Sequence, residues 1–319
     1  MNPLDFAVYR FLSPDGVARF WAGHRVIDPR ITPREVAERV GISESGVRAR
    51  LQNLTRQGFL RDQAVMPNPV LFGKRVFVAN LPIRQSSEVD RILHDLSLVD
   101  GVIFSRDVLD EDERKVQVYF VADNEASASR LTALLSRLSS KGSPVGSREY
   151  YTPPCDRVLS PLEWRVLGSV QRRPDATFAG IAGSVGVSLK TAARVYHHLI
   201  DSRACWWTHG PVSEEFPLAL VQVDLRSAKD REGVDGCILN EGHLWMPVAR
   251  DGFGLDPSRA EGILAGLVPA DLPTVLERFL RRLAAVEGVD GIRRTFALGS
   301  ASYPRWFSDQ MSQRTQARS

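Results

Sequence analysis

The 319-residue sequence has little cysteine, little lysine and no long apolar run. Its three cysteines, Cys155, Cys205 and Cys237, have no CxxC spacing, which excludes a disulfide scaffold and a cysteine-built zinc site. No stretch approaches the roughly 18 apolar residues of a membrane span, and the N-terminus lacks a signal-peptide pattern. We therefore expect a cytoplasmic protein with no membrane partner.

Charge of either sign is not in large excess. The net charge is +3, and only five of the 41 basic residues are lysine, so the remainder are arginine. Arginine suits bidentate contacts to phosphate and guanine, although such a bias can equally reflect genome composition. With 43% hydrophobic residues the chain is globular, and its length predicts about two to four domains.

Motifs of the common enzyme classes are also missing. There is no nucleophile elbow, phosphate-binding loop or dinucleotide fingerprint, and no histidine has a partner at metal-ligand spacing. The segment Asp251–Gly254 reads DGFG but lacks every other kinase signature. The sequence therefore predicts no catalytic residue, no metal, no cofactor and no enzymatic activity.

An internal repeat is the main feature that is present. Residues 32–54 align without a gap on residues 177–199, so that Thr32, Gly41 and Ser43 match Thr177, Gly186 and Ser188. The same offset of 145 residues aligns residues 76–78 with 221–223 and residues 135–148 with 280–293. Three separated segments in one register predict two copies of one unit, with a boundary near residues 152–155.

Each copy begins with the pattern of a helix-turn-helix. In the first copy Thr32 is a helix N-cap, Gly41 ends the helix, and Ser43 caps a second helix. The second copy repeats this plan from Thr177 to Leu199. A preceding helix is expected at about 15–21 in the first copy and 161–170 in the second. Wing hairpins are expected around 58–66 and 204–208, the latter exposing Trp206 and Trp207.

The second part of each copy has a βαββαβ rhythm. In the first copy we expect strands at 75–81, 101–108, 115–122 and 145–151, with helices at 87–97 and 126–138. In the second copy the expected strands are 218–225, 243–250, 262–268 and 291–298, with a helix at 273–285. Residues after about Ser308 are polar, which predicts a flexible tail.

The chain resembles the Lrp/AsnC (feast/famine) family of transcription regulators. The resemblance rests on VGISESGVRARLQNLTRQGFL in the first copy and VGVSLKTAARVYHHL in the second, each followed by a βαββαβ segment. It implies an α+β fold, a tandem duplication of a winged helix-turn-helix domain followed by a ferredoxin-like domain. The expected domains are 1–70 and 154–213 (winged helix-turn-helix), 71–153 and 214–308 (ferredoxin-like), and a tail at 309–319.

Double-stranded DNA is the partner that this organisation predicts. The N-terminal part of the second helix of the motif reaches base edges in the major groove. Arg48 and Gln52 lie one turn apart and could read guanine and adenine, while Ser45 and Arg50 suit phosphates. The predicted DNA-binding residues of the first copy are Ser43, Glu44, Ser45, Arg48, Arg50, Gln52 and Arg56.

The second recognition helix has a different surface. Ala193 and Val195 occupy the positions of Arg48 and Arg50. The predicted DNA-binding residues here are Ser188, Lys190, Arg194 and His197. An exposed aromatic wing would suit a protein interface or a groove wedge, so this copy can be either a DNA reader or a structural unit.

The resemblance also implies that the ferredoxin-like domains pair and that a small effector, often an amino acid, binds between them. The chain would then be a pseudo-dimeric monomer or a homodimer. Two alternatives remain open. One is an enzyme similar to siroheme decarboxylases, whose tetrapyrrole pocket would use His94, Arg106, His243 and Arg250. The other is a protein-interaction module without nucleic-acid affinity, whose behaviour would be insensitive to salt.

Overall fold

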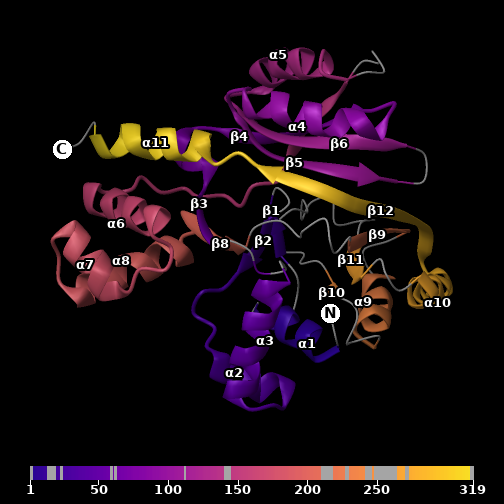
Figure 1. The fold of residues 1–319 in the computed structure, drawn as a ribbon, viewed down its shortest axis with the longest axis horizontal. Helices are drawn as coiled ribbons and strands as arrows, with labels where there is room; N and C mark the ends of the chain where they lie inside the picture. Colours follow the sequence, from indigo (N-terminus) through magenta and orange to yellow (C-terminus); the bar gives the residue numbers. More distant parts are fainter. Residues whose placement is uncertain are drawn as a thin grey trace.

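The computed structural model describes residues 3–12, 19–21, 24–57, 60, 63–110, 113–139, 145–209, 218–226, 230–240, 246–247, 264–269 and 273–316. These residues form a mixed α/β protein in which helices cover two antiparallel sheets (Figure 1). Among them no helix is long and apolar enough to cross a membrane.

The larger sheet has eight strands in the order β10-β11-β9-β12-β5-β6-β4-β7. Their bounds are β4 Arg75–Pro82, β5 Val102–Leu109, β6 Arg114–Ala122, β7 Ser147–Tyr150, β9 Leu218–Leu225, β10 Met246–Pro247, β11 Leu264–Pro269 and β12 Val289–Ser302. Each half places its own strands in the order fourth, first, third, second. The strand ranges expected from the sequence are confirmed to within a few residues, except that of the strand expected at 243–250 only Met246–Pro247 lies within the described residues.

Strand β12 joins the two halves. Its residues Val289–Ala297 pair with β9, and its residues Phe296–Ser302 pair with β5. A register shift between Ala297 and Gly299 marks the change of partner. One strand of the second copy therefore makes the sheet continuous.

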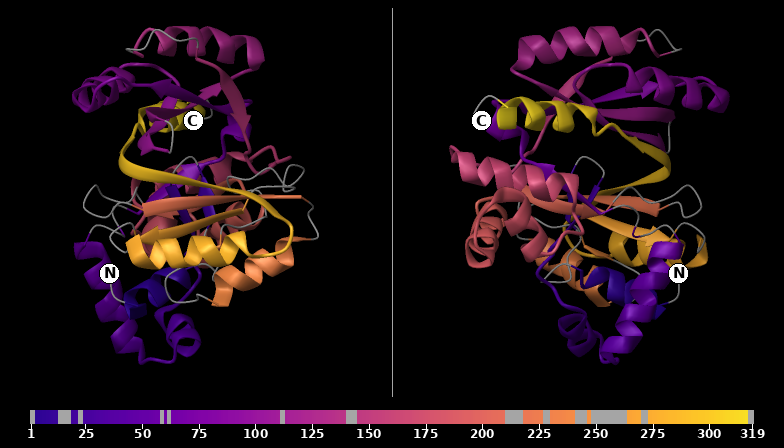
Figure 2. Two further views of the ribbon diagram at one scale, coloured as in Figure 1. Left: turned by 90° about the vertical axis from the view of Figure 1, so that its right-hand side faces the viewer. Right: turned by 60° about the vertical axis from the view of Figure 1, so that its left-hand side comes forward.

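Helices pack against each half of this sheet (Figures 1 and 2). Helices α4 (Val89–Ser97) and α5 (Glu125–Ser136) pack on the first half, where Ile92 and Leu135 are fully buried. Helices α9 (Arg231–Asn240) and α10 (Pro273–Ala284) belong to the second half. The short helices η1 (Pro69–Phe72) and η2 (Ser86–Glu88) connect strands and helices of the first half.

The smaller sheet draws its strands from both copies. Its order is β1-β2-β8-β3, with β1 Arg19–Trp21, β2 His24–Ile27, β3 Ala64–Pro67 and β8 Cys205–His209. The expected wing of the first copy is therefore wrong: β3 pairs with β8 of the second copy, and not within a local hairpin. Residues Gly58 and Phe59 of that wing lie outside the described residues.

Two helices differ from expectation in the first copy and at the C-terminus. The helix that precedes the first helix-turn-helix is α1 (Pro3–Arg10), whereas Arg19–Trp21 form a strand. The expected tail is wrong as far as Gln316, because α11 (Arg305–Gln316) lies along α6 and buries Trp306, Phe307 and Met311. In the second copy α6 (Pro161–Arg172) confirms the expected helix.

Candidate nucleic-acid interface

The first helix-turn-helix consists of α2 (Pro33–Val40) and α3 (Glu44–Arg56). Thr32 and Glu35 form a capping box at the start of α2, and Gly41 ends it with a φ of 74°. The left-handed conformation at Gly41 favours glycine because it has no Cβ. Ser43 then caps α3, its Oγ accepting a hydrogen bond from the Gly46 amide at 3.1 Å. The three-residue turn expected from the sequence is confirmed.

Burial on one side leaves the opposite face of α3 exposed. Val47 and Leu54 are fully buried, in a core that includes Phe6 and Tyr9 of α1. The exposed predicted residues are Ser43, Glu44, Ser45, Arg48, Gln52 and Arg56. Four of the predicted residues thus share this face with the helix cap Ser43, and Arg56 extends the exposed charge toward the helix end.

Arg48 is exposed but already has a partner. Its Nη2 lies 2.6 Å from Oε1 of Glu44, one turn earlier, and both side chains remain largely in solvent. Exposed pairs of this kind contribute about 0.2–1 kcal/mol. Exchange of the Glu44 carboxylate for a base edge is therefore inexpensive.

Arg50 has a different place from the one expected. Its Nη1 lies 2.8 Å from Oδ1 of Asp5, and the Asp5 side chain is only 2% exposed. Asn53 donates a hydrogen bond to the other Asp5 oxygen at 3.2 Å. The expected phosphate contact is corrected accordingly: Arg50 fastens α3 to α1.

The second helix-turn-helix repeats the caps of the first. Helices α7 (Phe178–Val185) and α8 (Leu189–Asp201) are separated by Gly186, whose φ is 73°. Ser188 caps α8 by accepting from the Thr191 amide at 3.2 Å. Lys190 and Arg194 are exposed. His197 is half-buried, with its ring 5.6 Å from that of Phe178, so it packs within the motif rather than standing free.

The expected exposed aromatic wing of the second copy is wrong. Trp206 and Trp207 are 3% and 5% exposed. They lie on β8, an interior strand of the smaller sheet, and because consecutive strand residues point to opposite faces, their burial shows that both faces are covered there. Trp206 packs edge-on against Trp21 with 4.8 Å between ring centroids. These tryptophans therefore belong to the core and offer no groove wedge.

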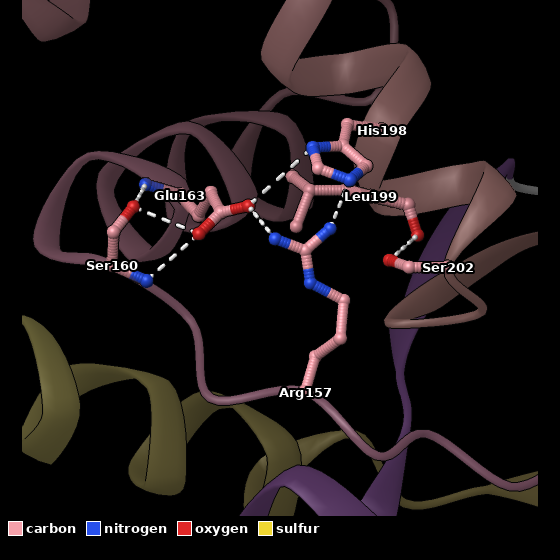
Figure 3. A network of polar contacts seen from close by, with 6 residues as sticks. All are labelled: Arg157, Ser160, Glu163, His198, Leu199 and Ser202. Atoms are coloured by element: carbon pink, nitrogen blue, oxygen red, sulfur yellow. Dashed lines mark hydrogen bonds and ion pairs between the residues drawn. The ribbon is translucent and has the colours of Figure 1, made fainter.

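A polar network fixes α8 to the start of α6 (Figure 3). Glu163 accepts hydrogen bonds from the backbone and hydroxyl of Ser160, each at 2.8 Å. Its other oxygen lies 2.9 Å from Arg157 Nη2 and 3.8 Å from His198 Nδ1. Burial alone would raise the pKa of Glu163, but the Ser160 hydrogen bonds and the charges of Arg157 and His198 hold it below its usual value.

A cavity of about 280 Å³ lies where the two halves of the larger sheet meet. Its polar wall contains Asp107 and Arg114, joined through two hydrogen bonds, with Ser86 on a third guanidinium nitrogen. Asp90 also lines the cavity, and Leu93 and Leu298 supply apolar surface. The cavity thus combines charges of both signs with an apolar wall.

Two of the four residues considered for a tetrapyrrole, His94 and Arg106, are described, and they lie on opposite faces of the larger sheet. His94 is exposed on α4, on the face of the sheet that α4 and α5 cover. Arg106 lies over the ring of Phe104, which belongs to the core on the opposite face. His243 and Arg250 lie outside the described residues. Within the part of the chain that the structure describes, no group of three or more metal-binding side chains is found.

Comparisons with known proteins match one domain profile and several solved structures. The profile of the winged helix-turn-helix DNA-binding family matches residues 28–61, the segment that contains α2 and α3. The chain therefore carries a winged helix-turn-helix domain. No curated protein matches the chain.

Among solved structures, the siroheme decarboxylase NirDL matches with a TM-score of 0.48 and 13% identity over 99% of both chains. The same enzyme with an iron-uroporphyrin III analogue matches at 0.49, with 11% identity over 100% of both chains. AsnC of E. coli matches at 0.33, with 13% identity over 50% of this chain and 97% of its own. At these values no function is carried over from any of them.

One expectation is nevertheless overturned. The prediction that the chain is not an enzyme conflicts with the two whole-chain matches, both of which are to a decarboxylase. That prediction is withdrawn.

Proposed function

We propose that the protein is a sequence-specific DNA-binding transcription regulator. The observation that carries this proposal is the exposed face of α3, which a capped helix-turn-helix in the matched winged domain presents to solvent. A helix held in this way can enter the major groove and present its N-terminal residues to base edges.

Arg48 and Gln52 are the readers of this proposal. Arg48 leaves Glu44 to donate two hydrogen bonds to guanine, and Gln52, one turn later, reads adenine. Ser45 and Arg56 contact phosphates, which position the helix without reading sequence. Arg50 holds α3 on α1 and makes no DNA contact.

The tandem organisation is part of the same proposal. Two features support it: equivalent N-caps and left-handed glycines at Gly41 and Gly186, and one strand order in both halves of the larger sheet. We place the domains at 1–70, 71–153, 154–213 and 214–308, with α11 added to the last. Since β12 pairs with β5 within one chain, a pseudo-dimeric monomer is favoured, and its mass in solution tests this.

The cavity between the two halves is the place that we propose for an amino-acid effector. Arg114 and the first turn of α4 suit a carboxylate, Asp90 suits an ammonium group, and Leu93 and Leu298 suit an apolar side chain. Bound there, an effector would touch the strand that joins the halves. Isothermal titration with the twenty amino acids, using Asp90→Asn as the altered protein, tests the site.

The experiment that tests the regulator is recovery of genomic fragments by the purified chain at two salt concentrations. Arg48→Ala should weaken the binding free energy for the recovered site by about 1–3 kcal/mol and reduce the sequence preference at one base pair. The matched control is Arg91→Ala, which removes an equally exposed arginine from an i,i+4 pair with Asp95 on α4. Recovery without a shared motif, or unaffected by salt, would refute the proposal.

A tetrapyrrole ligand is examined with the same preparation. The iron-uroporphyrin III analogue bound by the matched decarboxylase is added, and its visible absorption is recorded with and without the recovered DNA. A saturable spectral change would add tetrapyrrole binding to the activities of this chain.

A further inference from the structure

The smaller sheet holds the two helix-turn-helix units in one fixed arrangement. Strand β8 follows α8 in the chain, and it lies between β2, which precedes α2, and β3, which follows α3. The pairing of β3 with β8 is antiparallel, with Val65 opposite Trp207. Antiparallel pairing relates these two strands, each of which follows a recognition helix, by a local two-fold axis.

Polar contacts reinforce this junction. Asn68, which is fully buried, donates from Nδ2 to the carbonyl oxygens of Pro153 at 2.8 Å and Arg203 at 2.9 Å. Its backbone N–H donates a hydrogen bond to the carbonyl oxygen of Ala204 at 2.9 Å. On the surface, Arg30 Nη1 lies 2.7 Å from Oδ1 of Asp201, the last residue of α8. The segments that flank α2 and α8 are thereby tied to each other directly.

The two recognition helices nevertheless expose different side chains. At the offset of 145 residues, Arg48 matches Ala193, and Ser45 matches Lys190. Lys190 and Arg194 give α8 two exposed cations, and neither forms an ion pair with another described residue. On α3 the exposed readers are Arg48 and Gln52.

We propose that one chain binds a double-stranded DNA site composed of two different half-sites at one fixed spacing. This inference rests on the proposed function and extends it to the second unit. Dimers of identical helix-turn-helix subunits read palindromes because their symmetry is matched by that of the DNA. Here β3 and β8 keep a local two-fold relation, but α3 and α8 read unlike sequences, so the site is not a palindrome.

Selection from a random duplex library by the full-length protein tests this inference. The expected result is a motif with two unlike half-sites at a single spacing. An inverted repeat of one half-site, or one half-site alone, overturns the inference and leaves the proposed function standing. Failure to enrich any sequence removes both.

Variants then assign each half-site to its helix. Lys190→Ala should reduce the slope of log affinity against log salt by about 1, at roughly 0.9 for each lost phosphate contact, and Arg194→Ala should remove sequence preference in the half-site of α8. Arg48→Ala should instead remove sequence preference in the other half-site. The double control Arg91→Ala with Arg130→Ala removes two exposed cations from α4 and α5. It should change neither the salt slope nor the sequence preference in either half-site. An unchanged slope in the Lys190→Ala variant contradicts the inference.

Spacing gives a second, independent readout. Inserting about 5 base pairs between the half-sites turns one of them by half a helical turn, to the opposite face of the duplex. Because the shared sheet holds the units together, affinity should fall at least about tenfold, to that of one half-site. Equal affinity for both spacings would mean that the units move independently, and would overturn the fixed arrangement.

Discussion

Arg50 of α3 and Asp5 of α1 form an ion pair inside the first helix-turn-helix unit, with 2.8 Å between Nη1 and Oδ1. The Asp5 side chain is almost completely buried, whereas Arg50 keeps partial contact with solvent. Arginine on a recognition helix is a residue type that often contacts DNA, but here Arg50 connects α3 to α1.

Replacing Asp5 by alanine should therefore destabilise the protein. The guanidinium of Arg50 and the amide of Asn53 both lose an acceptor, and we expect the free energy of unfolding to fall by about 1–3 kcal/mol. Urea denaturation followed by tryptophan fluorescence measures this. The control Glu38→Ala breaks the exposed Arg34–Glu38 pair and should change stability by less than about 0.5 kcal/mol. Equal effects of the two variants would contradict the role given to Asp5.

Asn68 should be more sensitive to substitution than its size suggests. Asn68→Ala leaves the buried carbonyl of Pro153 and the part-buried carbonyl of Arg203 without this donor, at a cost of about 1–3 kcal/mol for a buried unsatisfied group. We expect a loss of stability in this range or above it, measured by thermal unfolding. Asn80→Ala is the matched control, because Asn80 is exposed and accepts only one long hydrogen bond, from Gln117 at 3.3 Å. If the two variants unfold at the same temperature, Asn68 does not hold the junction.

His24 should make stability depend on pH. Burial, with the nearby charge of Arg106, lowers the pKa of His24 to about 4. The unfolded chain, with a histidine pKa of about 6.5, binds more protons between these values, so stability is lost as pH falls from about 6.5 toward 4. The difference between the two pKa values corresponds to a loss of about 3 kcal/mol in the free energy of unfolding.

Denaturation of wild type and His24→Gln at pH 7 and pH 4.5 isolates this contribution. The loss of stability on acidification should be smaller in the variant. His94→Gln alters an exposed histidine and should behave as wild type does. A variant that loses as much stability as wild type would show that another group carries the dependence.

Helix α11 should stabilise the second helix-turn-helix unit. Phe307 is 2% exposed and belongs to the same core as Trp164 of α6. Phe307→Ala should therefore cost about 3–5 kcal/mol. Gln313→Ala, on the exposed side of the same helix, is the control and should have little effect. If calorimetry finds both variants equally stable, α11 does not pack on α6 in solution.

Local patterns predicted much of this fold. The turns at Gly41 and Gly186, the caps at Ser43 and Ser188, and the strands of the larger sheet follow from residue type and periodicity. The exposed face of α3 was predicted by the same periodicity, since Val47 and Leu54 define its buried side.

Long-range pairing explains the errors. The segment that contains Trp206 and Trp207 was correctly expected to be extended, but its burial depends on β2 and β3, which come from residues far earlier in the chain. Likewise, nothing within α3 indicates that Arg50 faces Asp5. The tail was misjudged because three apolar residues in a polar segment, Trp306, Phe307 and Met311, are enough to dock a helix when a partner surface exists.

The position of β8 between β2 and β3 affects the order in which the protein can fold during synthesis. Chains emerge from the ribosome N-terminus first, and N-terminal domains generally fold first. Here β2 and β3 can pair with β8 only after residues 205–209 have been synthesised. The strand that joins the halves of the larger sheet, β12, lies still closer to the end of the chain. An N-terminal fragment that ends before Cys205 would present two unpaired strand edges, so the nascent first unit completes its structure only after most of the protein has been made.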